Sequence, residues 1–520
     1  MKKSINIETQ IRSLTKILDD LRQGIIQIPP FQRDFVWERN NIRELFDSIK
    51  NNYPIGSILL WKPREHKAWP SRKIGSYTLP VCNGQQIYVL DGYQRLSSLF
   101  GCLTNPIKAG LEYDEKLRND YFDLYYDLED ESLVYMGGRD PGPSQVPVYI
   151  LMSTMDFRRY SRKNIEPFVN DEELEQYLDR ADAFSRSLVD YKVAVIEVTN
   201  AELDDAVDIF SRINSKGTEI SPDWMVNALA YNDDFSFALE IDNLKDRLHS
   251  FNFSGISRTA LFRCYQSAFD DKMYIDQANI EKLAKRDNFA EIVKATTPFI
   301  EKSVKFLFQE LNVIDYKLLP YNTQLIFLMT FFKKVPSPTV SQVAALKKWF
   351  WVTSYSNYFT IYSLSNQRRA FDHFVEYIKG IQNDMVYMDA TKQALTTLSF
   401  PEKISLASVR CRSLLLFELQ HYRDVMGTLP HKRGLNLKKL TVTVDGTPAN
   451  IVPYIGSERR VRRTSLLDNL DFQNEDDALY EALLLPRGHS DIRTILSGRR
   501  QLLIEKEKAF VEALGLKYSY

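Results

Sequence analysis

The segment VLDGYQRLSSLF, residues 89–100, combines residue types that suit phosphate chemistry. Gly92 would let a ligand approach the backbone closely, and a helix starting there would direct N–H groups at an anion. Arg95 could bind phosphate oxygens through two parallel hydrogen bonds, while Asp91 could hold a divalent ion or orient an attacking water. For this short string alone, a structural strand-to-helix turn with a solvated Arg95 is the favoured interpretation.

A second polar cluster lies in PPFQRDFVW, residues 29–37. Gln32, Arg33 and Asp34 stand between apolar residues that we expect to be buried. Arg33 would be a second phosphate contact in the functional interpretation. The alternative is a buried ion pair between Arg33 and Asp34 or another acid.

A third cluster lies in IFSRINSKGTEIS, residues 209–221, which follows a predicted helix. Arg212, Asn214 and Lys216 precede Gly217 and would supply donors to the same anion. A helix C-terminus with cationic residues and a glycine exit explains these residue types equally well.

The elements that would position these clusters alternate between strands and helices up to about residue 230. Apolar residues at helical spacing predict helices over residues 7–23 and 38–54, and a further helix from about Gln94 to Leu103. Apolar runs predict strands at IGSILLW, QIYVLDG and YKVAVIEVT, and Asn200 is the expected N-cap of the helix after the last of these. This alternation predicts a small mixed α/β domain.

The rest of the chain has helical periodicity with few strand patterns. Long helices are expected at IEKLAKRDNFAEIVKATTPFIEKSVKFLFQEL, VSQVAALKKWFWVTSYS and VRCRSLLLFELQHYRDVMG. A short strand, LKKLTVTVDG, and a last helix with Ser497 as a possible cap complete the chain. We therefore predict an α+β protein with three parts, at residues 1–235, 236–425 and 426–520.

Composition restricts the class of protein. The chain has 520 residues, a formal net charge of −1 and four scattered cysteines. A nucleic-acid surface would therefore have to be a local patch, and no disulfide framework or paired metal-ligand cysteines are expected. No apolar segment approaches the length of a membrane span, and the N-terminus does not resemble a signal peptide. These features predict a soluble cytoplasmic protein that has no membrane partner.

Four segments together resemble a known family. FQRDFVW, YPIGSILLW, VLDGYQRLSSL and IFSRINSKGTEIS have the order of the DGQQR-motif domain at the N-terminus of GmrSD-type modification-dependent restriction enzymes. That domain belongs to the ParB/sulfiredoxin-like superfamily. LPYNTQLIFLMTFF and LKKWFWVTSYSNYF are similar to the helical region that follows in many members, so the resemblance covers roughly residues 8–420.

The resemblance implies a nucleotide-binding pocket, hydrolysis of a nucleoside triphosphate with Mg²⁺, and a role in defence against foreign DNA. The positions that match the family's motifs would have catalytic roles at Asp91, Gln94 and Arg95, with Asp91 also contacting Mg²⁺. Of the other matching positions, Arg33, Gly92, Arg212, Asn214 and Gly217 would bind nucleotide or phosphate. Gln32, Tyr93 and Lys216, which lie within the same motifs, are further candidates for this binding.

Two departures from the family pattern bear on activity. Tyr93 stands where the family usually has glutamine, which weakens the case for water positioning more than the case for binding. Many relatives end in an HNH nuclease domain, but the six histidines here include no HNH-type arrangement, so residues 426–520 are interpreted as degenerate or unrelated to that domain. The basic run SERRVRR offers a DNA contact, or a solvated loop, at Arg459, Arg460, Arg462 and Arg463.

Two functions follow from these patterns. The first is a nucleotide-binding, NTP-hydrolysing protein of a DNA restriction or anti-phage defence system. The second is a non-catalytic regulatory subunit that binds nucleotide or DNA and acts with a separate nuclease. A nuclease centred on Asp91 is a weaker third option because few other carboxylates accompany the motifs, and no Walker-type P-loop string occurs.

Overall fold

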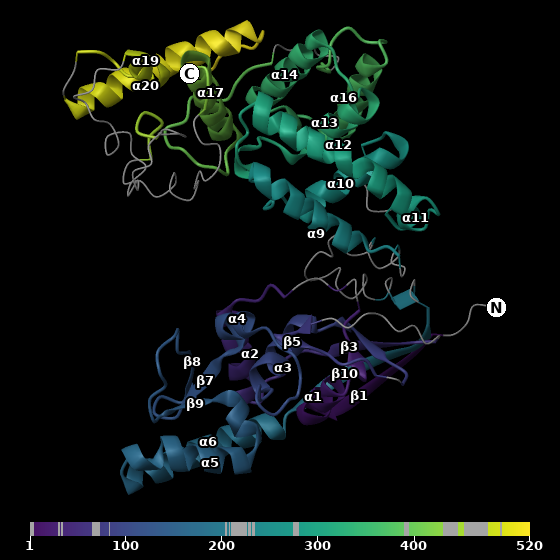
Figure 1. Cartoon of the computed structure of the whole chain (residues 1–520), viewed down its shortest axis with the longest axis vertical. Coiled ribbons are helices and arrows are strands. Elements are labelled where there is room, and N and C mark those ends of the chain that lie inside the picture. The colour runs from purple at the N-terminus through teal and green to yellow at the C-terminus, as the bar shows by residue number, and fades with distance from the viewer. Residues whose placement is uncertain are drawn as a thin grey trace. The chain divides into compact units, whose positions relative to one another are not determined.

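The chain forms two compact units, residues 1–229 and 230–520, in a computed structural model (Figure 1). Each unit is described by itself. The structure describes residues 5–29, 32, 35–64, 73–82, 84–202, 205, 206, 209, 226, 230, 234–273, 280–388, 395–429, 446–451, 477–488 and 491–520.

The first unit is built on a five-stranded mixed sheet with the strand order β1-β10-β3-β6-β2. β10 pairs in parallel with β3 and antiparallel with β1, while β6 pairs antiparallel with β3 and in parallel with β2. A second sheet has the order β8-β7-β9, and β4 pairs with β5. The strands are β1 (Asn6–Ser13), β2 (Ile26–Gln27), β3 (Ile58–Pro63), β4 (Lys73–Ile74), β5 (Tyr77–Thr78), β6 (Ile87–Asp91), β7 (Leu124–Asp127), β8 (Ser132–Tyr135), β9 (Gln145–Pro147) and β10 (Lys192–Ala201).

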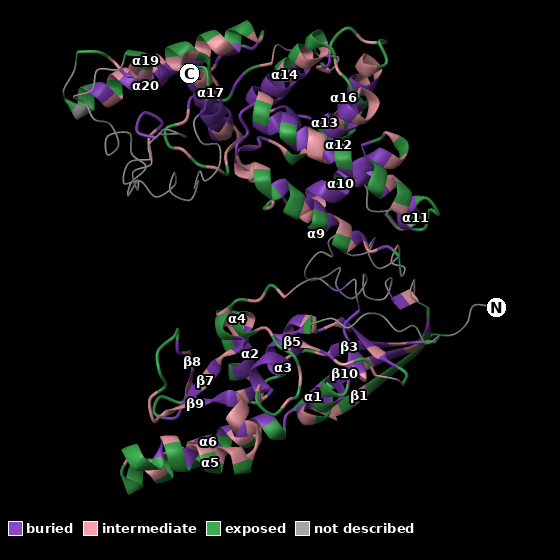
Figure 2. Ribbon diagram, viewed as in Figure 1, coloured by how far each residue is buried: buried purple, intermediate pink, exposed green. Residues whose placement is uncertain are grey.

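Helices of the first unit contribute to a single apolar core with the main sheet. The helical elements are α1 (Leu14–Arg22), α2 (Arg39–Lys50), α3 (Tyr93–Leu103), α4 (Glu115–Leu117), η1 (Arg118–Phe122), η2 (Val148–Met152), α5 (Thr154–Asn164), η3 (Glu166–Phe168) and α6 (Asp171–Val189). The core joins the apolar faces of α1, α2 and α3 to alternate residues of β3, β6 and β10. Figure 2 shows this burial along the sheet and α3. The predicted inner face of α2 is confirmed by the burial of Ile42, Leu45, Phe46 and Ile49.

The start of the chain corrects one prediction. Residues 7–23 were expected to form one helix, but β1 occupies Asn6–Ser13 and α1 begins only at Leu14, with the Ser13 side chain as its cap. The spacing of Ile7 and Ile11 fits a helix, yet it also fits the two-residue period of a strand. Backbone pairing with β10 along all eight residues decides for the strand.

Asn200 is not the helix N-cap that the sequence indicated. It lies inside β10 and has a left-handed φ of 57°. The backbone N–H of Ala206 bonds to the carbonyl of Glu202, and the Asp205 side chain accepts from the N–H of Glu202. The strand is therefore longer than expected, and the helical turn starts later.

The second unit is mainly helical in the part of the chain that the structure describes. Its elements are α9 (Phe237–Leu248), η4 (His249–Phe251), α10 (Arg258–Asp270), α11 (Ile280–Ala284), α12 (Phe289–Glu310), η6 (Tyr316–Leu318), α13 (Asn322–Lys334), α14 (Val340–Tyr355), α15 (Tyr358–Ile361), α16 (Leu364–Ile378), α17 (Val409–Met426), α19 (Asp477–Ala482) and α20 (Ile492–Ala513). Of the helices described, none is long and apolar enough to cross a membrane.

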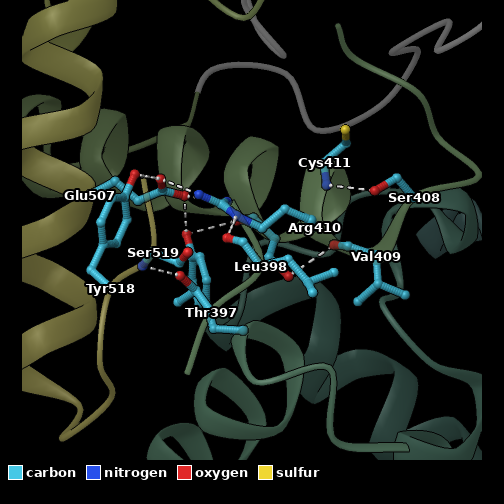
Figure 3. Close-up of polar contacts among 11 residues, drawn as sticks. Thr397, Leu398, Ser408, Val409, Arg410, Cys411, Glu507, Tyr518 and Ser519 are labelled. Carbon is cyan, nitrogen blue, oxygen red and sulfur yellow. Dashed lines mark hydrogen bonds and ion pairs between the residues drawn. The ribbon is translucent and has the colours of Figure 1, made fainter. Parts of the chain in front are cut away.

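A buried ion pair joins α17 to the last helix, α20. Arg410 donates from Nη1 and Nη2 to the two carboxylate oxygens of Glu507 at 2.7 and 2.6 Å, and both side chains are almost fully buried. The hydroxyls of Tyr355 and Tyr518 each donate to the same carboxylate at 2.8 Å. Figure 3 shows Arg410 reaching Glu507 and the C-terminal segment that carries Tyr518. Four donors thus converge on one buried acid.

A second buried pair links α17 and α20 further along. Arg499 donates to Glu418 at 2.6 Å and to the carbonyls of Leu483, Pro448 and Ala449, each at 2.9 Å. The other oxygen of Glu418 is buried and has no hydrogen-bond partner in the described part of the chain. Burial raises the pKa of the Glu418 carboxyl to about 7, an effect that the nearby Arg499 opposes.

The predicted α+β class is confirmed, with a mixed unit followed by a mainly helical one. The prediction of Ser497 as a helix cap was wrong, because α20 starts at Ile492 and Asp491 caps it through the N–H of Thr494. The expected strand at LKKLTVTVDG lies almost entirely outside the described residues. The division at residues 235 and 425 stays a prediction.

Candidate functional site at the β6–α3 turn

The DGYQR residues lie where β6 ends and α3 begins, as the sequence indicated. Asp91 is the last residue of β6 and pairs with Leu59 of β3, so the sheet fixes its position. Gly92 follows with φ 94°, a conformation that residues with a side chain rarely adopt. A Cβ at Gly92 would also lie 2.3 Å from Cδ1 of Ile58. The sharp turn and the close packing together require glycine here.

Arg95 folds back across this turn. Its Nη2 donates to Oδ2 of Asp91 at 3.1 Å, and its Nη1 donates to the carbonyl of Ile55 at 2.8 Å. The Arg95 side chain is 17% exposed and that of Asp91 33%, so the pair stands at the edge of the solvent. Gly56 lies beside it, and a Cβ there would be 2.5 Å from Nη1 of Arg95. The guanidinium is therefore held in one orientation from two sides.

Two glutamines attach the preceding polar cluster to the motif. Nε2 of Gln32 lies 3.4 and 3.3 Å from the carbonyls of Val89 and Leu90, in the strand that leads to Asp91. Oε1 of Gln94 accepts from the backbone N–H of Val36 at 2.9 Å. Both glutamine side chains are buried. The structure thus brings the cluster around residue 32 next to the β6–α3 turn, as the shared-site hypothesis requires.

Tyr93, the residue that departs from the family pattern, has a structural contact. Its hydroxyl donates to the carbonyl of Lys73 in β4 at 3.2 Å. The ammonium group of Lys73 lies 3.5 Å from the Asp114 carboxylate in an exposed ion pair. Tyr93 therefore links the first turn of α3 to the β4–β5 hairpin.

The far end of α3 is fixed by a buried arginine. Nη1 of Arg118 donates to the carbonyl of Gly101 at 3.0 Å and to the hydroxyl of Tyr77 at 3.1 Å. The Tyr77 hydroxyl in turn donates to the carbonyl of Thr104, and burial raises the pKa of Tyr77 to about 12. These contacts anchor the C-terminal end of α3 to Arg118 and Tyr77.

Several predicted site residues lie outside the described part of the chain. They are Arg33, Arg212, Asn214, Lys216 and Gly217, and the DNA-contact candidates Arg459, Arg460, Arg462 and Arg463. Their roles stay predictions. Among the residues that the structure does describe, no group of three or more histidine, cysteine or acidic side chains could hold a metal ion.

Sequence reasoning missed two contributors to the site. The Ile55 carbonyl and Gly56, in the YPIGSILLW segment, form the surface against which Arg95 packs. The glycine was visible in that motif, but nothing in the sequence indicated that it faces Arg95. Every residue has a backbone carbonyl, so residue type does not indicate which carbonyl binds Arg95. Only the fold reveals that contact.

Comparison with known proteins agrees with the motif geometry. Residues 14–231 match the family model of the GmrSD restriction endonuclease N-terminal domain. An uncharacterized protein of Methanocaldococcus jannaschii is 22% identical over 413 residues, which cover 72% of this chain and 68% of that protein. That length exceeds the first unit, so the similarity extends into the helical one. Residues 14–231 of this chain are therefore similar to the GmrSD restriction endonuclease N-terminal domain.

Proposed function

We propose that this protein is a component of a DNA restriction or anti-phage defence system whose first unit binds and hydrolyses a nucleoside triphosphate. The supporting observation is the orientation of Arg95 between Asp91 and the Ile55 carbonyl at the start of α3. An arginine held in this way has lost its rotamer freedom before a ligand arrives, which lowers the entropic cost of binding. The match to the GmrSD N-terminal domain supports the defence context.

The chemistry of this turn suits a phosphate group. A guanidinium has five N–H donors, and the two bonds within the described structure leave others for phosphate oxygens. The positive end of the α3 dipole lies at the same place and favours an anion. Arg33, Arg212, Asn214 and Lys216 are the proposed further donors, with Gly217 giving close backbone approach. Together such groups would stabilise the charge that develops during phosphoryl transfer.

Mg²⁺ is proposed to accompany the nucleotide. Oδ2 of Asp91 bonds to Arg95, so Oδ1 is the oxygen that can contribute to a metal site. A single carboxylate is sufficient where nucleotide phosphates and water provide the remaining ligands of Mg²⁺. Asp91 would therefore have two tasks, to orient Arg95 and to hold the ion.

The second candidate is a regulatory subunit that binds nucleotide or DNA without hydrolysis and acts with a separate nuclease. One observation favours it: Oε1 of Gln94 is already engaged by the N–H of Val36, so this amide holds the chain together in the described state. Tyr93 likewise has its hydroxyl bonded to Lys73. While these bonds persist, Oε1 of Gln94 and the hydroxyl proton of Tyr93 are not available to orient an attacking water.

The test is NTP hydrolysis by the full chain with Mg²⁺, with and without duplex DNA, alongside nucleotide binding. Arg95→Lys and Asp91→Asn are the informative variants, because lysine cannot reproduce the forked contacts of arginine. Arg22→Lys and Asp19→Asn are matched controls, since that pair is an exposed i,i+3 ion pair on α1. Hydrolysis lost only in the first two variants supports the proposal. Binding of nucleotide or duplex DNA without hydrolysis in the wild type selects the regulatory subunit. A wild type that does not hydrolyse NTP and binds neither nucleotide nor duplex DNA refutes both candidates.

A further inference from the structure

Helix α5 presents a basic face that has no ion-pair partner among the residues that the structure describes. Arg158, Arg159, Arg162 and Lys163 are all exposed, and none forms an ion pair with a residue that the structure describes. Asp156, the acid in this helix, is already paired with Lys108. Residues three and four apart share a helix face, so the four cations form one continuous surface. Met155, which is 59% exposed, lies within it.

Helix α6 presents the opposite charge. Asp171, Glu172, Glu175 and Asp179 are exposed, and in the described part of the chain none has a salt bridge. Their spacing again places them on one side of the helix. The buried residues of α6 are Ala181, Phe184 and Leu188, which contribute to the core. The acidic face is thus the outer one.

The two helices are close neighbours in the chain and are supported by the same element. η3 connects them, and both pack against η2. Figure 2 shows much of their surface exposed. Phe168 in the connection is 68% exposed and Leu178 on α6 is 38% exposed. Large apolar side chains left open beside charged faces are typical of a surface that another protein covers.

We infer that the α5–α6 hairpin is a self-association surface, in which the basic face of α5 binds the acidic face of α6 in a second copy of this chain. In a two-fold symmetric dimer the contact between α5 and α6 occurs twice, so the four cations of each copy lie opposite the four acids of the other copy. Met155, Phe168 and Leu178 would provide apolar contact between the charged rows. A DNA backbone fits less well, because the acidic face of α6 adjoins the basic one and repels phosphate.

Charge-swap variants test this pairing. Variant A carries Arg158→Glu and Arg162→Glu, which cancels the net charge of the α5 face and leaves the α6 face acidic. Variant B carries Glu175→Arg and Asp179→Arg, which cancels the net charge of the α6 face and leaves the α5 face basic. All four positions are exposed, so neither variant should disturb the core. Arg368→Glu with Arg369→Glu, on exposed positions of α16, changes the net charge by the same amount as variant A and is the matched control.

The measurement is mass by sedimentation or light scattering over a concentration series. We expect a wild-type and control dimer that weakens as salt rises from about 0.1 M to about 1 M, because the screening length falls from about 10 Å to about 3 Å. Variants A and B should each associate at least about tenfold more weakly, a loss of about 1.4 kcal/mol. Mixed together, A and B should form a heterodimer, because the acidic α6 face of A can bind the basic α5 face of B. In the second α5–α6 contact of that heterodimer, the introduced glutamates of A can pair with the introduced arginines of B.

Three results would overturn the inference. A wild type that stays monomeric at low salt excludes this dimer, and loss of duplex DNA binding in variant A would then assign the α5 face to nucleic acid. A dimer that both variants retain would place the interface elsewhere. Monomeric variants that fail to associate when mixed would show that α5 and α6 do not face each other across the interface.

Discussion

Replacement of Glu507 by glutamine should destabilise the second unit by roughly 3–5 kcal/mol, the usual effect of breaking a buried ion pair. The Glu507 side chain is fully buried and receives two bonds from Arg410 and one each from Tyr355 and Tyr518. An amide has one oxygen where the carboxylate has two, and its NH₂ group would face a donor. The neutral side chain would also leave Arg410 as a buried cation without its counter-ion.

Denaturant unfolding of the full chain, combined with hydrogen exchange on peptides from α17 and α20, measures this loss. Hydrogen exchange is needed because the two units can unfold separately. At about 2–4 °C for each kcal/mol in a unit of this size, the thermal midpoint should fall by roughly 10 °C. Glu505→Gln is the control, since Glu505 is exposed on the same helix and should change stability by less than about 0.5 kcal/mol.

The double variant Arg410→Met with Glu507→Met discriminates a broken charge pair from general core damage. With both charges removed, the double variant should be more stable than either single variant. A residual cost of about 1–3 kcal/mol is expected from the Tyr518 hydroxyl, which loses Glu507 as its acceptor. The Tyr355 hydroxyl should cost less, because it retains the carbonyl of Ser413 at 3.3 Å. Single variants that lose less than about 1 kcal/mol, or a double variant that loses their sum, would refute the reasoning.

Three further predictions follow from the described contacts. Burial raises the pKa of the Glu418 carboxyl to about 7 in the folded state, above its ordinary value of 4.5. Because the pKa is raised, ionisation of Glu418 opposes folding, so stability should fall by about 3 kcal/mol as pH rises from about 4.5 to above 7. Glu418→Gln should flatten that pH dependence in unfolding experiments, and an unchanged slope would contradict the assignment. Gly56→Ala should weaken nucleotide binding because the new Cβ would meet the Arg95 side chain. Gly110→Ala is the control, since Gly110 also has a positive φ but no atom that the structure describes lies within 4 Å of its Cβ position. Equal nucleotide binding by both variants would contradict the proposed contact between Arg95 and the nucleotide. Tyr93→Gln, which restores the family residue, should raise the rate of NTP hydrolysis, and a fall in turnover would count against a water-positioning role for a glutamine at this position.

Local sequence patterns were sufficient to predict the helices and strands that position the DGYQR motif. The helix over α2 and the strand–turn–helix at β6 and α3 were predictable because their apolar residues recur with one period and Gly92 marks the turn. The long helices α14 and α17 follow from the same periodicity. The identity of the domain was also recognisable, because four motifs occur in a fixed order along the chain.

Other features depended on partners that are distant in the sequence. Isoleucines at positions 7 and 11 fit a helix and a strand equally well, and pairing with β10 decided between them. The partners of Arg95 include a backbone carbonyl at Ile55, and the partner of Arg410 is 97 residues away. Residue types and their spacing indicate which groups can form ion pairs and hydrogen bonds. Which groups meet is decided by the tertiary fold, because burial removes competing water and leaves each polar group only the partners that the packing places beside it.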